Sequence, residues 1–157
     1  MNPNDVIPGY RSDEIITSES TRASRLKWVI VVDSDLPPGR LANAVACVAA
    51  STGDAIAGML GPQCPDASGY LHPGLPWAGC TVLGASAERL ANTRARAVAA
   101  EGVWVGDMPL HAQVTRVHDD YEAELARTAP GDLQSLALSI VGPRDTVDRI
   151  VKKLRLL

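Results

Sequence analysis

Phenylalanine is absent from this sequence of 157 residues, and aromatic side chains make up only 4% of it. Apolar residues still account for 46%, which is ordinary for a globular chain. Leu, Val, Ile and Ala must therefore build the core, in which Trp28, Trp77 and Trp104 are the large side chains. No apolar run approaches the roughly 20 residues of a membrane-spanning helix, and residues 1–25 carry no secretory apolar segment. We therefore expect a cytoplasmic protein without a membrane partner.

Several short motifs of enzymes and metal sites are also missing. Cys47, Cys64 and Cys80 are odd in number and scattered, and no CxxC or HxxxH pattern is present, so neither a disulfide framework nor a metal site is indicated. The absence of GxSxG argues against a serine-hydrolase elbow. The absence of GxGxxG and of the Walker pattern argues against dinucleotide-binding and P-loop enzymes. We therefore expect no cofactor.

Positive charge is in short supply. Lys and Arg number 15 against 18 Asp and Glu, which gives a formal net charge of −3. Proteins that bind nucleic acid non-specifically use a basic field, which this chain lacks as a whole. The composition therefore counts against a nucleic-acid partner, although it leaves a local basic patch open.

The residues that are present divide the chain into two parts. Residues 1–24 are rich in Ser, Thr, Asp, Glu, Pro and Gly, a composition that predicts a flexible arm. A short helix capped by Ser12 is an alternative for this segment, as is docking of the arm on a neighbouring subunit. Residues 25–157 then form one domain, a length that is sufficient for one sizeable core.

Strand and helix patterns alternate along this domain. Residues 26–32 are apolar and rich in β-branched side chains, as expected of a central strand that is covered on both faces. Similar patterns predict further strands and helices, namely strands at 80–85, 103–105 and 133–141 and helices at 39–51, 87–100, in the second part of 111–127 and within 142–154. The alternation predicts an α/β single-domain sandwich with a four-stranded mixed sheet flanked by helices.

The turn after the first strand is one candidate site. It carries Asp33, Asp35, Gly39 and Arg40, at the edge of the sheet where α/β proteins bind ligands. The first amides of the following helix have no intrahelical partner, so together with Arg40 they would hold a phosphate or a carboxylate. A simpler alternative stays open, in which the two aspartates cap the turn and Arg40 is a solvated residue.

A second candidate site follows the third predicted strand. Asp107 would lie just past the end of that strand, with His111 after it, and both would share a crevice with Arg40 if the two strands are parallel neighbours. Asp107 would orient or deprotonate a water, and His111 would act as an acid or a base. A turn-forming aspartate and a structural histidine are the alternatives.

The segment 61–79 is crowded with Gly and Pro and is long for a plain connection. We expect it to bring His72 and Trp77 to the crevice as a wall or lid. Cys47 falls within the apolar pattern of the helix at 39–51, so we expect it in the core.

Three segments carry a family resemblance. KWVIVVDSDLPPGRLANAVA (27–46) reads as an opening strand, a turn and a helix of small residues. EGVWVGDMP (101–109) is a later strand that delivers an Asp, and GPRDTVDRIVKKLRLL (142–157) is a terminal Gly-Pro and Leu-rich pattern. Together they resemble the type II peptidyl-tRNA hydrolase superfamily, and are most similar to a bacterial branch of unknown function. The resemblance covers residues 26–157.

The resemblance implies a hydrolase that cleaves the ester between tRNA and a peptide or amino acid, and that forms a homodimer or higher homo-oligomer. The family's lysine position falls on Arg40, its glutamine on Ala44, its histidine on Cys47 and its aspartate on Asp107. Arg40 still offers a cation to a small anionic ligand but does not deliver a proton as a lysine does, and Ala44 offers no hydrogen bond. The alternative is therefore a non-catalytic or small-molecule-binding oligomeric module on the same scaffold.

Overall fold

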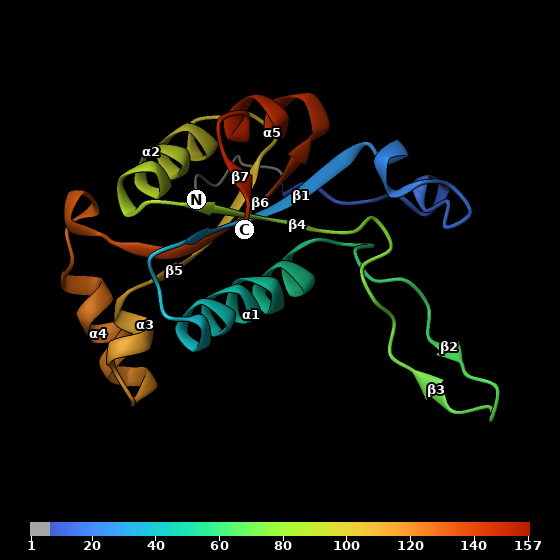
Figure 1. Cartoon of the computed structure of the whole chain (residues 1–157), viewed down its shortest axis with the longest axis horizontal. Coiled ribbons are helices and arrows are strands. Elements are labelled where there is room, and N and C mark those ends of the chain that lie inside the picture. The colour runs from blue at the N-terminus through green and yellow to red at the C-terminus, as the bar shows by residue number, and fades with distance from the viewer. Residues whose placement is uncertain (1–6) are drawn as a thin grey trace.

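A mixed five-stranded sheet forms the centre of the protein (Figure 1). Its strands are β1 (Leu26–Asp33), β4 (Thr81–Ala85), β5 (Trp104–Pro109), β6 (Ser135–Pro143) and β7 (Arg155–Leu156). The structure is a computed structural model and describes residues 7–157. The strand order is β5-β6-β1-β4-β7. β1 and β4 are parallel, whereas β6 is antiparallel to both β1 and β5, and β7 is antiparallel to β4.

The predicted α/β class is confirmed, and the sheet holds one strand more than the four expected. The additional strand, β7, contributes two residues that pair with Leu83 and Gly84 of β4. Two residues are too few for a periodic pattern, so nothing in the sequence marks this strand. β5 is also longer than the predicted strand at 103–105, because β6 continues to pair with it as far as Pro109.

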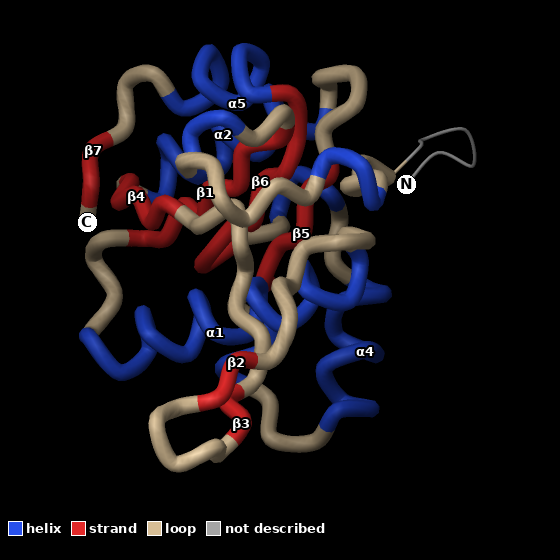
Figure 2. Tube along the Cα trace, turned by 90° about the vertical axis from the view of Figure 1, so that its right-hand side faces the viewer, coloured by secondary structure: helices blue, strands red, loops and turns tan. Residues whose placement is uncertain are grey.

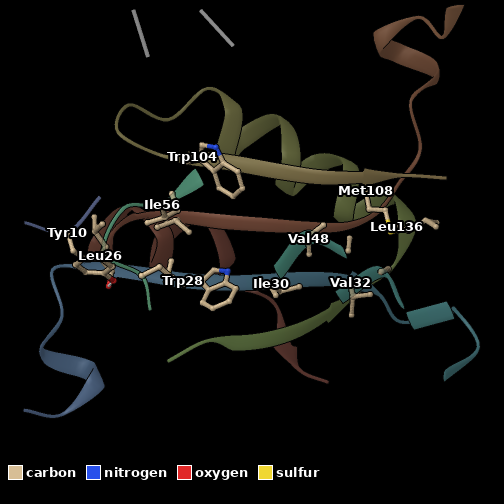
Figure 3. Packing of buried hydrophobic residues seen from close by; sticks show 14 residues of the cluster. Tyr10, Leu26, Trp28, Ile30, Val32, Val48, Ile56, Trp104, Met108 and Leu136 are labelled. Carbon is tan, nitrogen blue, oxygen red and sulfur yellow. Dashed lines mark hydrogen bonds between the residues drawn. The ribbon is translucent and has the colours of Figure 1, made fainter. Parts of the chain in front are cut away.

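Strands β1 and β6 are buried on both faces of the sheet, because their side chains are almost wholly apolar. In β1, Trp28, Ile30 and Val32 face one apolar cluster, whereas Val29 and Val31 face a second. Figure 3 shows the first cluster, in which the indole rings of β1 and β5 supply much of the volume that phenylalanine would supply elsewhere.

Helices pack on both faces of the sheet. They are α1 (Pro38–Ala55), α2 (Ala87–Val98), α3 (His111–Val114), α4 (His118–Arg127) and α5 (Arg144–Val151). Figures 1 and 2 show α1 and α4 on one side of the sheet and α2 and α5 on the other. α1 begins at Pro38, which suits a first turn because proline lacks an N–H that would stay unpaired there. α2 begins after Ser86, whose side-chain oxygen accepts a hydrogen bond from the backbone N–H of Arg89.

The described part of the predicted arm lies against the domain. Tyr10 is buried, and its hydroxyl lies 3.0 Å from the hydroxyl of Ser24. The Arg144 guanidinium donates hydrogen bonds to the backbone carbonyls of Ser24 and Thr21. Where a short helix after Ser12 was the alternative, the described residues of the arm have two 3₁₀ turns, Ser12–Glu14 and Thr21–Ala23. Residues 1–6 of the predicted arm lie outside the described residues.

The segment 61–79 forms a small hairpin of β2 (Cys64–Pro65) and β3 (Leu71–His72) that projects from the body of the molecule (Figure 1). It follows the C-terminal end of α1 and leads back into β4. Within residues 7–157, no helix combines the length and apolar character needed to cross a membrane.

Candidate active site

The strand directions bring the two candidate segments to one edge of the sheet. β1 and β5 run in the same direction because each is antiparallel to β6, which lies between them. Leu138 of β6 pairs with Val31 on one side and with Asp107 on the other, so Asp107 lies two residues short of the level of Asp33. Asp107 is therefore inside β5, whereas the sequence predicted it just past a shorter strand.

A pocket of about 570 Å³ opens between α1, the end of β5 and the segment that forms α3 and α4. We call it the Asp107 pocket. Its α1 wall presents Asn43, Cys47 and Ser51, which are spaced four residues apart and therefore share one face of the helix. Val48 and Met108 form an apolar floor.

Cys47 is exposed in this pocket, so its predicted place in the core is wrong. The stripe of α1 that meets the sheet consists of Ala44, Val48 and Thr52, which are buried. Cys47 lies on the neighbouring stripe, and that stripe faces the pocket rather than the sheet. Apolar composition alone does not separate these two stripes in a helix so rich in alanine.

The Asp107 carboxylate is held by two neighbours. Its Oδ2 accepts a hydrogen bond from Arg94 Nε of α2 at 2.6 Å and another from the Ser135 hydroxyl at 3.3 Å. Both bonds use the same oxygen, so Oδ1 is left to accept a hydrogen bond from a ligand or water. Arg94 is 13 residues from Asp107, and no local pattern connects the two in the sequence.

Tyr121 of α4 lines the opposite wall of the pocket. Burial raises the pKa of its phenol, and the negative charges of Asp107 and Glu122 raise that pKa further. The phenol is therefore a neutral hydrogen-bond donor near pH 7. His118 lies in the same wall, with its ring 5.6 Å from that of Tyr121 and its Nε2 3.3 Å from the Glu122 carboxylate.

Arg40 lies one helical turn before Asn43 and does not line the pocket, so the crevice expected to hold both Arg40 and Asp107 is not formed. We call the position of Arg40, next to the lining residue Asn43, the rim. Its Nε donates to Gln113 Oε1 at 2.7 Å. The Gln113 amide in turn donates to the Arg40 carbonyl at 2.8 Å and to Asn43 Oδ1 at 3.0 Å. Arg40 and Asp107 thus have different partners, Gln113 and Arg94, and Gln113 links the rim to the pocket wall.

The other predicted residues lie elsewhere. His111 Nε2 lies 3.1 Å from the Thr128 hydroxyl, and the His111 ring does not line the pocket. Asp33 is buried, and its Oδ1 accepts a hydrogen bond from the Asp35 backbone N–H at 3.0 Å, which is the turn-capping arrangement. Gly39 lies in the first turn of α1, and a Cβ at this position would meet no atom within 4 Å.

His72 and Trp77 are separated from the Asp107 pocket. They belong to the hairpin segment, which follows the far end of α1, as Figure 1 shows. His72 Nε2 lies 3.4 Å from the Asp66 carboxylate, and the Trp77 indole donates to the carbonyl of Gly58 at 2.8 Å. The hairpin therefore does not form the expected wall or lid of this pocket. In the described residues, no group of three or more His, Cys, Asp and Glu is placed to hold a metal ion.

Comparisons with known proteins identify a family and a fold. A family model described as "Protein of unknown function (DUF2000)" matches residues 26–157. A solved structure of a protein of unknown function, Atu0240 from Agrobacterium tumefaciens str. C58, is 18% identical to the chain with a TM-score of 0.74. The match covers 85% of this chain and 98% of that one, so the fold is shared. No curated protein matches the chain.

Proposed function

The chain belongs to the DUF2000 family of proteins of unknown function, and we propose that it is an ester hydrolase whose active site is the Asp107 pocket. One observation carries the proposal. Asp107 and Cys47 are far apart in the sequence, yet both line this pocket. They are the positions on which the resemblance to type II peptidyl-tRNA hydrolases places an aspartate and a histidine. Their meeting in one pocket supports an active site at the position that the resemblance implies, with a cysteine in place of the family's histidine.

Asp107 is the residue we assign to the chemistry. Its free Oδ1 accepts a proton from a water, while the oxygen of that water attacks the ester carbonyl carbon. The bond between this carbon and the alcohol oxygen then breaks, and the alcohol leaves with the proton that Asp107 had accepted from the water, which regenerates the carboxylate. Arg94 and Ser135 are positioning residues, because they hold the carboxylate through Oδ2.

We propose an aminoacyl- or peptidyl-tRNA as the substrate, on the strength of the family resemblance. Two features at the pocket are compatible with such an ester. The pocket volume of about 570 Å³ falls in the usual range for small ligands, which suits the acyl group. Arg40 at the rim is exposed, and its terminal guanidinium nitrogens are left to contact a phosphate because only its Nε bonds to Gln113.

The test is release of an N-acetylated amino acid from tRNA by the purified protein. We expect Asp107→Asn to lower the rate about 100-fold or more, because the amide cannot accept the proton from water. The matched control is Asp54→Asn, which removes the same charge from an exposed position of α1 outside the pocket. We expect this control to retain full activity. Absence of turnover by the wild-type protein, or equal losses in both variants, would refute the hydrolase proposal.

A second candidate is a small-molecule-binding module without catalysis. It is favoured by Ala44, which is buried and offers no amide at the family's glutamine position. It is favoured also by the pairing of Asp107 with Arg94, an arrangement that serves structure as well as chemistry. A protein that binds ligands in the pocket but leaves acylated tRNA intact would support this candidate.

We also propose that the protein forms a homodimer or a higher homo-oligomer, as the resemblance implies. The projecting hairpin supports this assembly because Tyr70, Leu71 and Leu75 are exposed on it.

A further inference from the structure

A second pocket lies at the other edge of the sheet, where β1 and β4 begin. Its volume is about 530 Å³. Four separate segments form it, namely the end of the arm, the start of β1, the start of β4 with the residues before it, and the first turn of α5. Figure 1 shows these segments together at the end of the sheet away from α3 and α4. Among residues 7–157, its walls carry Arg22, Lys27 and Arg144 and no Asp or Glu. We call it the basic pocket.

Neighbouring groups leave most of this positive charge uncompensated. Lys27 forms an ion pair with Asp148 of α5, which lies outside the lining. The Arg144 guanidinium donates to the carbonyls of Thr21 and Ser24, which are neutral acceptors and so leave its charge intact. The side chain of Arg22 makes no hydrogen bond or ion pair within residues 7–157.

The remaining walls suit an anion. Thr21 and Thr81 are among the lining residues, and threonine carries a hydroxyl that can donate a hydrogen bond to an anion. Cys80 also lines it, and burial raises the pKa of this thiol to about 12, so the thiol carries no negative charge at pH 7. Gly79 has φ +71°, in the left-handed region that favours glycine, so the backbone beside Thr21 turns there without strain.

We propose that the basic pocket binds the phosphate group of a small phosphate-bearing molecule. Arg22, Lys27 and Arg144 hold the phosphate oxygens through charge-assisted hydrogen bonds. The volume exceeds that of a phosphate alone and leaves room for an organic part of the ligand. Because the whole chain has a net charge of −3, its overall field does not attract anions, and the attraction must be local. Such a ligand also joins the arm to the domain, so binding stabilises the docked arm.

Calorimetric titration of the full chain with pyrophosphate at low salt tests the proposal, with citrate as a second anion. We expect saturable binding of pyrophosphate, and we expect Arg22→Gln to weaken it about tenfold or more. Arg22 is exposed, and within the described residues its side chain makes no hydrogen bond or ion pair whose loss would destabilise the fold. Arg89→Gln is the matched control, because it removes the same charge from an exposed position on α2 outside the pocket. We expect this control to bind as the wild type does.

Three results would overturn the proposal: no saturable binding of pyrophosphate, equal weakening by both variants, or citrate binding as tight as pyrophosphate. A second readout is the rate of trypsin cleavage after Arg22 in the wild type. We expect pyrophosphate to slow this cleavage, because a ligand bound between the arm and the domain stabilises the docked arm. Asp107→Asn should bind pyrophosphate normally, because Asp107 lies in the other pocket. The outcome is therefore independent of the hydrolase proposal.

Discussion

Three buried polar side chains connect α1 to the two central strands. The Trp28 indole N–H donates to the Ser139 hydroxyl at 2.8 Å, and this hydroxyl lies 2.5 Å from that of Thr52. The Thr52 hydroxyl also bonds to the carbonyl of Val48 at 2.6 Å. Each polar group in this chain is satisfied by the next, which is why two hydroxyls are tolerated where no side chain is exposed to water. Loss of the Ser139 hydroxyl would leave the Trp28 indole N–H without its acceptor, whereas the Thr52 hydroxyl would keep its bond to the Val48 carbonyl.

Replacing Ser139 by alanine should therefore destabilise the fold. The variant leaves the Trp28 indole N–H buried without an acceptor, which costs about 1–3 kcal/mol in the free energy of unfolding. Urea denaturation followed by fluorescence measures this change. Ser51→Ala is the comparison, since it removes an exposed hydroxyl one residue before Thr52 and should change the free energy of unfolding by less than about 0.5 kcal/mol. If Ser139→Ala is as mild as Ser51→Ala, the buried network contributes nothing.

At the scale of elements, the sequence predicts a strand or a helix correctly wherever the hydrophobic pattern of that segment alone determines its structure. The apolar run of β1 and the alternation that follows it predict the α/β class. The parts that were not foreseen depend on a partner elsewhere in the chain. β5 extends to Pro109 because β6 continues to pair with it, and β7 exists because β4 offers an open edge.

The same distinction applies to the candidate site. Asp107 was foreseen as a polar residue at a strand end, which is a local signal. Its partner Arg94 was not, because the pairing depends on how α2 packs over β5. The sequence misplaced Cys47 for a related reason, since its stripe of α1 faces a pocket whose other walls come from β5, α3 and α4, and no local pattern indicates that packing.

The arm contains an ion pair that predicts a titration. Hydrogen bonds from the Arg25 side chain and the Arg11 backbone lower the pKa of Glu14 from its ordinary value of 4.5 to about 2. A carboxyl group whose pKa is lowered by folding favours the docked arm at pH values above 4.5, and this contribution is lost as the pH falls toward 2. We expect NMR titration of the Glu14 carboxyl carbon to give a midpoint near 2.

Arg25→Gln should move that midpoint back toward 4.5, because it removes the principal donor. Arg22→Gln provides a charge-matched control within the arm, since Arg22 does not contact Glu14. A wild-type midpoint at 4.5 would mean that the docked arm seen here is not held by this pair in solution.

At the scale of the whole molecule, the hairpin is the feature whose two strands lie outside the central sheet. The base of the segment packs on the first apolar cluster through Trp77 and Ala78, whereas β2 and β3 project from the body of the molecule (Figure 1). Three of its large side chains are more than half exposed, namely Tyr70 (66%), Leu71 (53%) and Leu75 (76%). Large apolar side chains gathered on a projecting segment are typical of a surface that another chain covers. In the proposed homo-oligomer, the hairpin of one subunit therefore packs on a neighbouring subunit.

Light scattering coupled to size exclusion, over a series of protein concentrations, tests this assembly. We expect a dimer or larger assembly for the wild type, and we expect Leu75→Asp to raise its dissociation constant about tenfold or more, because a charge would be buried in the interface. Leu156→Asp is the matched control, since Leu156 is equally exposed, at 76%, but lies in β7 rather than in the hairpin. A monomeric wild type would refute the oligomer proposal. Equal dissociation of both variants would contradict the placement of the interface at the hairpin. A surface charge added at either position would then weaken the assembly to the same extent.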